Sequence, residues 1–108
     1  MDQLSVVLAK FPFTNQIDYK IRSALIISNS KFNAIHQYFW VCPITSKTSM
    51  PEFELELTAN EFSGKLDSKS YIRTDNISSL EKGLFIKEIG KISAKLFEKL
   101  KQELAKNL

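Results

Sequence analysis

The pair Arg73 and Asp75 is the part of this sequence whose residue types and spacing best suit catalysis. Both lie in the strand-like run of residues 71–75, and residues two apart on a strand point to the same face. Asp75 could then accept a proton from a ribose 2′-hydroxyl, while Arg73 stabilises a charged phosphate. The alternative is a surface ion pair, which contributes little to stability.

Two further apolar runs end next to groups that suit phosphate binding. Arg22 precedes the run of residues 23–27, and Thr45 and Ser46 follow the run of residues 38–44. Strand ends that carry cations, hydroxyls and a carboxylate are what an RNA-cleaving site needs. The same pattern also arises where polar residues simply mark the points at which strands leave the core.

Length and charge set broad limits on the protein. With 108 residues, of which 44% are hydrophobic and 25% charged, we expect one soluble globular domain over residues 1–108. The net charge is +3, and its distribution is uneven: residues 1–51 hold five Lys or Arg against two Asp or Glu, whereas residues 52–108 hold ten of each. This excess near the candidate site is compatible with a polyanionic partner.

The scarcity of cysteine and histidine excludes several kinds of chemistry. One Cys and one His cannot build a zinc site, and a two-histidine ribonuclease mechanism is impossible. We expect Cys42 to be a buried hydrophobic residue and His36 an exposed loop residue. The sequence predicts no metal and no cofactor. No apolar stretch is long enough to span a membrane, and no signal peptide is visible, so we expect a cytoplasmic protein.

Short apolar runs predict most of the secondary structure. Strands are expected over residues 6–9, 22–28, 37–45, 52–57 and 84–89, with one or two more within 71–80. A polar loop is expected over residues 14–21 and a helical turn over 30–36. Strict alternation from Glu52 to Leu57 is the clearest sign of a half-buried strand, and Gly90 should end the last strand.

The C-terminal segment changes to helical spacing. Apolar residues recur at Phe97, Leu100, Leu104 and Leu108, and Ser93 is a suitable N-cap. Lys99 and Glu103 are expected to form an ion pair four residues apart. The whole pattern predicts a mainly β (α+β) fold: a small β-barrel of five to seven strands with a C-terminal helix.

Five sequence blocks, taken in order, resemble the MazF/PemK family of toxins from bacterial type II toxin–antitoxin systems. The resemblance covers roughly residues 5–104, and the blocks are residues 7–14, 22–28, 41–46, 71–77 and 89–93. It implies an SH3-like β-barrel with a C-terminal helix. It also implies metal-independent, sequence-selective cleavage of single-stranded RNA, a homodimer, and a cognate antitoxin whose flexible segment occupies the RNA groove.

The resemblance also carries over particular residues. The catalytic positions of the family match Arg22, Thr45, Arg73 and Asp75, and the loop of residues 13–20 matches the segment that gates its groove. The residues then expected to bind RNA are Thr14, Asn15, Lys20, Ser46 and Lys47. A homodimer is also expected because one small barrel would leave large apolar side chains uncovered, among them Phe39, Trp40 and Phe97.

The chain departs from the family pattern at three places. Leu4-Ser5 stands where a Gly-Asp pair is usual, Ser23 replaces the Pro after the first Arg, and Asn76 replaces a Gln. Losing the Pro removes a fixed φ, so the aim of Arg22 is less constrained. Three other functions therefore stay open: a catalytically weak or inactive homologue that binds RNA or antitoxin, a gyrase poison of the same fold, and a general SH3-like interaction domain.

Overall fold

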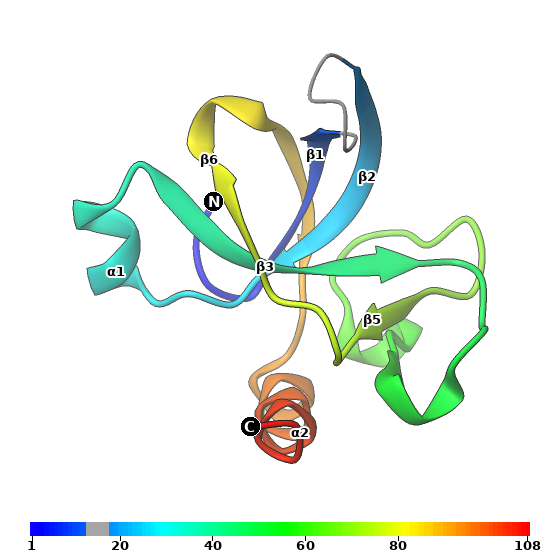
Figure 1. Ribbon diagram of the computed structural model, residues 1–108. Helices are drawn as coiled ribbons and strands as arrows, with labels where there is room; N and C mark the ends of the chain where they lie inside the picture. Colours follow the sequence, from blue (N-terminus) through cyan, green and yellow to red (C-terminus); the bar gives the residue numbers. More distant parts are fainter. Residues whose placement is uncertain (13–17) are drawn as a thin grey trace.

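Seven short strands form one antiparallel sheet in the computed structural model, which describes residues 1–12 and 18–108. The strands are β1 (Ser5–Pro12), β2 (Tyr19–Ile26), β3 (Tyr38–Thr45), β4 (Glu54–Glu56), β5 (Tyr71–Arg73), β6 (Ser78–Glu81) and β7 (Phe85–Lys91). The helices are α1 (Ser30–Ile35) and α2 (Ala94–Ala105), with 3-10 turns η1 (Pro51–Phe53), η2 (Ala59–Glu61) and η3 (Lys82–Leu84) (Figure 1). The predicted mainly β class with a C-terminal helix is confirmed.

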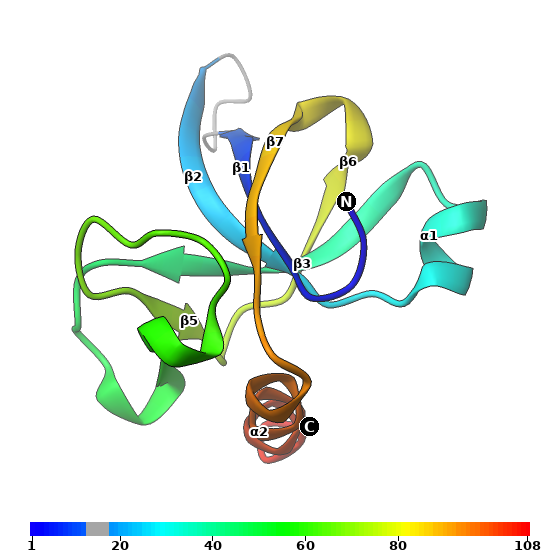
Figure 2. The same ribbon diagram turned by 180° about the vertical axis from the view of Figure 1, so that it is seen from behind.

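The sheet curls into an open, barrel-like shape. Its strand order is β4-β5-β3-β2-β1-β7, and β6 pairs with the start of β3, whereas β5 pairs with its end (Figure 2). The two ends of this order meet only through the segments that follow β4 and β7. There the Ser63 N–H donates to the Lys91 carbonyl at 2.9 Å, and the Ser93 N–H donates to the Glu61 carbonyl at 2.8 Å. The sheet itself stays open, and a narrow bridge around Phe62 and Ile92 links its two ends.

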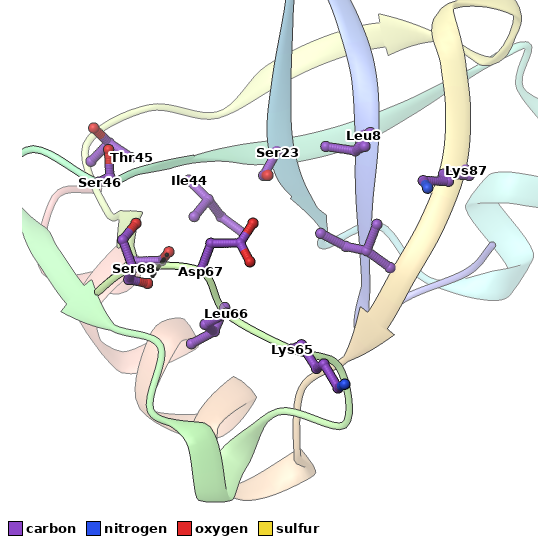
Figure 3. A pocket seen from close by; sticks show the side chains of 12 residues that line it. Leu8, Ser23, Ile44, Thr45, Ser46, Lys65, Leu66, Asp67, Ser68 and Lys87 are labelled. Atoms are coloured by element: carbon purple, nitrogen blue, oxygen red, sulfur yellow. Dashed lines mark hydrogen bonds between the residues drawn. The ribbon is translucent and has the colours of Figure 1, made fainter.

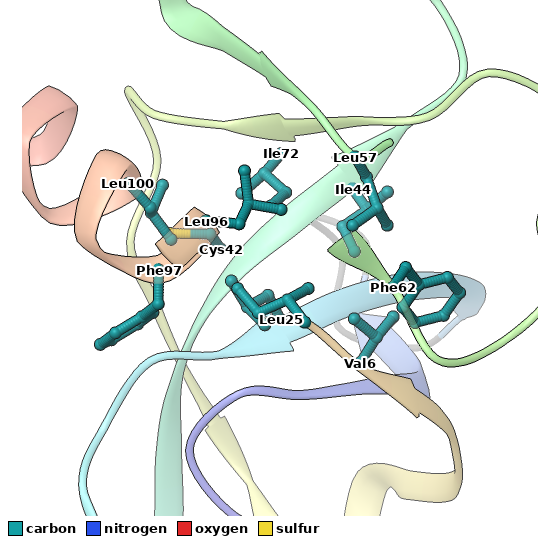
Figure 4. Close-up of a cluster of buried hydrophobic side chains, with 11 residues drawn as sticks. Val6, Leu25, Cys42, Ile44, Leu57, Phe62, Ile72, Leu96, Phe97 and Leu100 are labelled. Atoms are coloured by element: carbon teal, nitrogen blue, oxygen red, sulfur yellow. The ribbon is translucent and has the colours of Figure 1, made fainter. Parts of the chain in front are cut away.

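Two hydrophobic clusters lie on opposite faces of the central strands. Alternate residues of β1, β2 and β3 point to each face, which explains why these strands are nearly continuous apolar runs. One cluster contains Val6, Leu25 and Cys42 with three residues of α2 (Leu96, Phe97 and Leu100), so the helix covers that face (Figure 4). The other contains Val7, Ala9, Ala24, Ile26, Phe39, Val41 and Leu80.

Helix α2 begins as predicted and ends earlier than predicted. The Ser93 hydroxyl accepts a hydrogen bond from the Leu96 N–H at 3.0 Å, which confirms the N-cap. The helix ends at Ala105, so Leu108 is 97% exposed and does not continue the apolar stripe. The predicted Lys99–Glu103 pair is wrong, because the charged groups pair three residues apart instead, as Glu98–Lys101 and Glu103–Lys106.

The largest error in the predicted strands is at the β1–β2 hairpin. The chain pairs as far as Pro12 with Tyr19, so residues 19–21 are strand and not loop. These residues are exposed, so they carry no apolar pattern that could have predicted a strand. Only Glu54–Glu56 of the expected 52–57 strand forms a ladder, because η1 occupies residues 51–53.

Gly90 does not end the last strand. Strand β7 continues to Lys91, and the Phe62 ring lies so close to Gly90 that an added Cβ would be 2.5 Å from it. The glycine is needed for this contact between the two segments that link the ends of the sheet.

Cys42 is fully buried, and His36 is half-buried. Cys42 is buried as predicted, and burial raises the pKa of its thiol to about 12, so the thiol stays protonated and inert. His36 is half-buried rather than exposed: its ring stacks on Phe32 at a centroid distance of 3.9 Å. Phe32 also contacts Trp40, so this aromatic group lies where α1 meets the start of β3.

Leu4 adopts a backbone conformation that normally favours glycine. Its φ is 79°, the only positive φ among non-glycine residues in the described chain. Two hydrogen bonds fix this conformation: the Leu4 N–H donates to the Ile26 carbonyl at 3.1 Å, and the Leu4 carbonyl accepts from the Ile92 N–H at 3.0 Å. The Leu4 side chain also packs against the core, so a residue other than Gly holds this conformation here.

We expect Leu4→Gly to be more stable than Leu4→Ala. At most positions in a folded chain the Ala variant is the more stable of the two. Both variants lose the side-chain packing, but only Gly relieves the left-handed strain, so the difference in unfolding free energy should be roughly 0.5–1 kcal/mol. Urea denaturation measures it. The same two substitutions at half-buried Leu8 in β1 are the control and should give the opposite order. If the Gly and Ala variants had the same order of stability at both positions, strain at Leu4 would not explain it.

Candidate functional site

Strands β2 and β3 separate to form a wedge at one end of the sheet. They pair only over three residues each, from Ala24↔Pro43 to Ile26↔Val41. The ladder ends at Pro43, which has no N–H to donate. Beyond it, β2 continues along β1 while β3 turns toward β5 (Figure 1). Polar side chains can therefore face each other across the gap.

The wedge brings Arg22 and Thr45 together. A hollow of about 230 Å³, here called the Arg22 hollow, is lined by Lys20, Arg22, Ser23, Ile44, Thr45, Ser46 and Lys47. Five residues predicted from the sequence thus lie around one space, although they come from two strands and a loop. The predicted RNA-binding residues Thr14 and Asn15 lie outside the described residues.

Arg22 is held by its strand and by an aromatic side chain. It pairs with Ala9 in the β1–β2 ladder, and its guanidinium lies 5.9 Å from the centre of the Phe11 ring. Ser23, which replaces the expected Pro, pairs with Leu8 in the same ladder. The ladder therefore holds the backbone at the position where the Pro was expected, and the looser aim expected for Arg22 stays a prediction.

Thr45 has a hydroxyl that is anchored at the edge of the hollow. Its Oγ1 accepts a hydrogen bond from the Lys47 N–H at 3.2 Å. This turn places Lys47 and Ser46 beside Thr45 at the end of β3. A phosphate in the hollow would therefore meet a hydroxyl, backbone of the turn and three cations, Lys20, Arg22 and Lys47.

Arg73 and Asp75 form the predicted contact. The Arg73 Nε donates to Asp75 Oδ1 at 3.0 Å, and Nη2 donates to Oδ2 at 2.7 Å, so both carboxylate oxygens are engaged. The hydrogen bonds from Arg73 lower the pKa of the Asp75 carboxyl and raise the pKa of the Arg73 guanidinium. Asp75 is therefore charged at neutral pH and intrinsically a weak base.

This ion pair faces the same side of the sheet as Thr45 but lies outside the Arg22 hollow. Thr45 pairs directly with Tyr71, and Arg73 is two residues further along β5, so all three point to one face. Asp75 itself lines a separate hollow of about 170 Å³ beside the end of α2. The structure thus joins Arg22 to Thr45 and sets Arg73–Asp75 on the next strand.

The sequence analysis missed a second, larger hollow on the other side of the wedge. It has a volume of about 440 Å³ and shares Ser23, Ile44, Thr45 and Ser46 with the Arg22 hollow (Figure 3). Its remaining wall contains Asp67, Lys65 and Lys87. The only signal in the sequence is the alternation of charge over residues 65–69, inside a loop that has no apolar pattern.

Residues 1–12 and 18–108 contain neither a cluster of metal-binding side chains nor a membrane-spanning helix. No group of three or more His, Cys, Asp or Glu side chains comes together there as a metal site would require. None of the helices in this part of the chain is long and apolar enough to cross a membrane.

Comparison with known families decides the class of the protein. The family model described as "PemK-like, MazF-like toxin of type II toxin-antitoxin system" matches residues 2–108. The chain belongs to this toxin family. The resemblance read from the five sequence blocks is confirmed over nearly the whole chain. In a search of curated proteins, no sequence matched.

Solved structures of MazF-like toxins share the fold at low sequence identity. A MazE–MazF complex from Deinococcus radiodurans superimposes with a TM-score of 0.81 at 21% identity, covering 99% of this chain and 94% of that one. An endoribonuclease in complex with its cognate antitoxin from Mycobacterial species gives 0.78 at 19%, covering 98% and 92%. The Mycobacterium tuberculosis toxin MazF-mt6 gives 0.75 at 19%, covering 94% and 93%.

Proposed function

We propose that this MazF-like toxin is an endoribonuclease that cleaves single-stranded RNA at short specific sequences without a metal ion. The observation that carries the proposal is the wedge between β2 and β3, where Arg22 and Thr45 flank one hollow together with Lys20 and Lys47. Cations and a hydroxyl around a space of this kind suit an RNA phosphate. One of the solved relatives is itself named an endoribonuclease.

The reaction we propose is a transesterification within the RNA. The 2′-oxygen attacks the adjacent phosphorus, the bond to the 5′-oxygen of the next nucleotide breaks, and the products carry a 2′,3′-cyclic phosphate and a 5′-hydroxyl. Arg22 and Arg73 stabilise the charge that builds on the phosphate oxygens, and Thr45 donates a hydrogen bond to one of them. The arginines keep their protons, since guanidinium groups stay charged at any working pH.

Asp75 is the proposed acceptor of the 2′-hydroxyl proton. Arg73 holds its carboxylate in one orientation through two hydrogen bonds. Because the same bonds lower the pKa of Asp75, the proton must transfer as the phosphorane forms and then pass to the leaving 5′-oxygen, directly or through water. Each Asp75 oxygen accepts one hydrogen bond from Arg73 and keeps a second lone pair, on which the proton can be accepted.

We further propose that the protein acts in the cytoplasm. Its proposed partners are a cognate antitoxin and a second copy of the chain. Solved relatives include MazE–MazF complexes. Of the three residues that suggested a dimer, Phe39 and Phe97 are buried within the chain, so they no longer support it, whereas Trp40 is 43% exposed. An exposed Ile77 adds to the apolar surface that a second copy would cover.

Purified protein is expected to cut bulk RNA equally well in EDTA, since no cluster of metal ligands exists in the described chain. The fragments should have 5′-hydroxyl ends, which a polynucleotide kinase labels without prior phosphatase treatment. Loss of cutting on chelation with recovery on adding Mg²⁺ would contradict the mechanism. Inhibition of DNA supercoiling with no RNA cutting would identify a gyrase poison instead. Binding of RNA or antitoxin without cutting would identify a decayed toxin.

A further inference from the structure

The hollow beside Asp67 is built differently from the Arg22 hollow. Its inner wall is apolar and contains Leu8, Ile44, Leu66 and Ile89. Its volume of about 440 Å³ falls in the range of small-ligand pockets, about 300–1,000 Å³. An apolar wall suits the flat face of a nucleobase, whereas the Arg22 hollow offers mainly charge and hydroxyls. The two hollows share Thr45 and Ser46, so they adjoin at the proposed point of cleavage.

Asp67 is the one carboxylate in this hollow. Its side chain extends from the loop of residues 64–70 into the space between that loop and strands β2 and β3 (Figure 3). It is exposed, and within the part of the chain that the structure describes it has no hydrogen-bond or ion-pair partner. This contrasts with Asp75, whose two oxygens are both bound by Arg73. Both oxygens of Asp67 are therefore available to a ligand.

Two lysines make the hollow acceptable to a polyanion despite Asp67. Lys65 and Lys87 also line it, on the loop and on β7, and both are exposed. With Lys20, Arg22 and Lys47 around the adjoining hollow, five cations line the two hollows together. A single RNA strand could thus keep its phosphates near cations while one base turns toward Asp67.

The chemistry of a carboxylate selects among the four bases. A carboxylate only accepts hydrogen bonds, and it has two oxygens side by side. Guanine presents two adjacent donors, N1–H and the N2 amino group, so it can bind both oxygens. Cytosine and adenine present one amino group beside a ring nitrogen that repels the second oxygen. Uracil presents one N–H flanked by two carbonyl oxygens, which makes it the worst match.

We propose that this hollow is a base-recognition subsite in which Asp67 selects guanine at a position next to the scissile phosphate. The apolar wall packs against the base, and Lys65 and Lys87 bind the flanking phosphates. This inference rests on the proposed ribonuclease function and adds to it the residue that sets part of the sequence preference. Recognition of unstacked bases through their Watson–Crick edge is the usual way in which proteins read single-stranded RNA.

The test compares cleavage preferences of the native protein, Asp67→Asn and Glu81→Gln on a randomised single-stranded RNA pool, with sequencing of the cut ends. Glu81 is an exposed carboxylate on β6 outside this hollow, so it controls for the lost charge. The native protein and Glu81→Gln should prefer guanine at one of the two positions beside the cut. In Asp67→Asn the preference for guanine over the other bases should be at least about five-fold weaker, the lower limit for one base-specific contact.

A binding measurement separates failure of this inference from failure of the proposed function. A randomised 2′-fluoro RNA pool cannot undergo 2′-oxygen attack, so selection on it reports binding alone, even if the native protein cuts no RNA. Enrichment of guanine by the native protein and its loss in Asp67→Asn would support the subsite. Absence of a guanine preference in the native protein would overturn it. An unchanged preference in Asp67→Asn would overturn it as well, whether or not the rate of cleavage falls.

Discussion

A single 2′-deoxy substitution on the 5′ side of the scissile phosphate should abolish cleavage while leaving binding nearly intact. The described chain offers no cluster of metal ligands to activate water, and the one histidine is stacked on Phe32 at the far end of β3 from Thr45. The groups at the proposed site cannot easily make a strong external nucleophile. They can use a neighbouring hydroxyl, whose fixed proximity is worth an effective concentration of about 10⁵ M or more.

The measurement uses a chimeric oligonucleotide with one deoxyribose at the cleavage position, and the all-ribose oligonucleotide is its reference. The rate of cutting at that phosphate should fall by at least about 10⁴-fold, since the nucleophile itself is removed. The dissociation constant should change by less than about ten-fold, because only one modest hydrogen bond is lost. Efficient cutting of the chimera at the same phosphate would mean that water attacks, and the role of Asp75 would then be wrong.

The core of the fold could be predicted from local patterns because those patterns have strong physical causes. The central strands are apolar on both faces, and the helix has both a correct N-cap and an apolar stripe that covers one cluster. The β1–β2 hairpin extends further than predicted because Tyr19, Lys20 and Ile21 are exposed. Pairing with the neighbouring strand holds them, and nothing in their own sequence indicates it.

The site was predictable only where its geometry is local. Arg73 and Asp75 are two residues apart, so the strand period alone brings them together, and the structure gives them two hydrogen bonds. Arg22 and Thr45 lie around one hollow because β2 and β3 stop pairing at Pro43 and leave a gap between them. The family resemblance implied that the two residues share a site, but their spacing in the sequence did not. Asp67 could not be found this way. Its loop is held at the wedge by contacts distant in sequence: residues 61–63 bond to residues 91–93, and the Leu57 N–H donates to the Ser70 carbonyl.

Strain and departures from the family pattern also needed the structure. Leu4 replaces a usual Gly, and the sequence alone does not show whether the backbone changes with the residue. The φ of 79° shows that Leu4 itself holds the left-handed conformation that glycine adopts most readily. Ser23 stands in place of the expected Pro, and it pairs with Leu8 in the β1–β2 ladder. At both positions the backbone is therefore held in place, by hydrogen bonds at Leu4 and by the ladder at Ser23.

Arg22→Ala is expected to lower kcat/KM for RNA cleavage by about 10²–10³-fold, the usual effect of removing a group that stabilises developing charge. Arg22→Lys should recover part of this loss, because it keeps the charge but not the planar fork of donors.

The fold should tolerate both changes, since Arg22 is exposed and its only described side-chain contact is with the Phe11 ring. Lys31→Ala, which removes a positive charge on α1 at the other end of β3, is the matched control and should cut normally. If Arg22→Ala and Lys31→Ala lowered the rate equally, Arg22 would contribute only to the general attraction of RNA. The phosphate would then have to be held elsewhere, with Arg73 on the next strand as the remaining arginine.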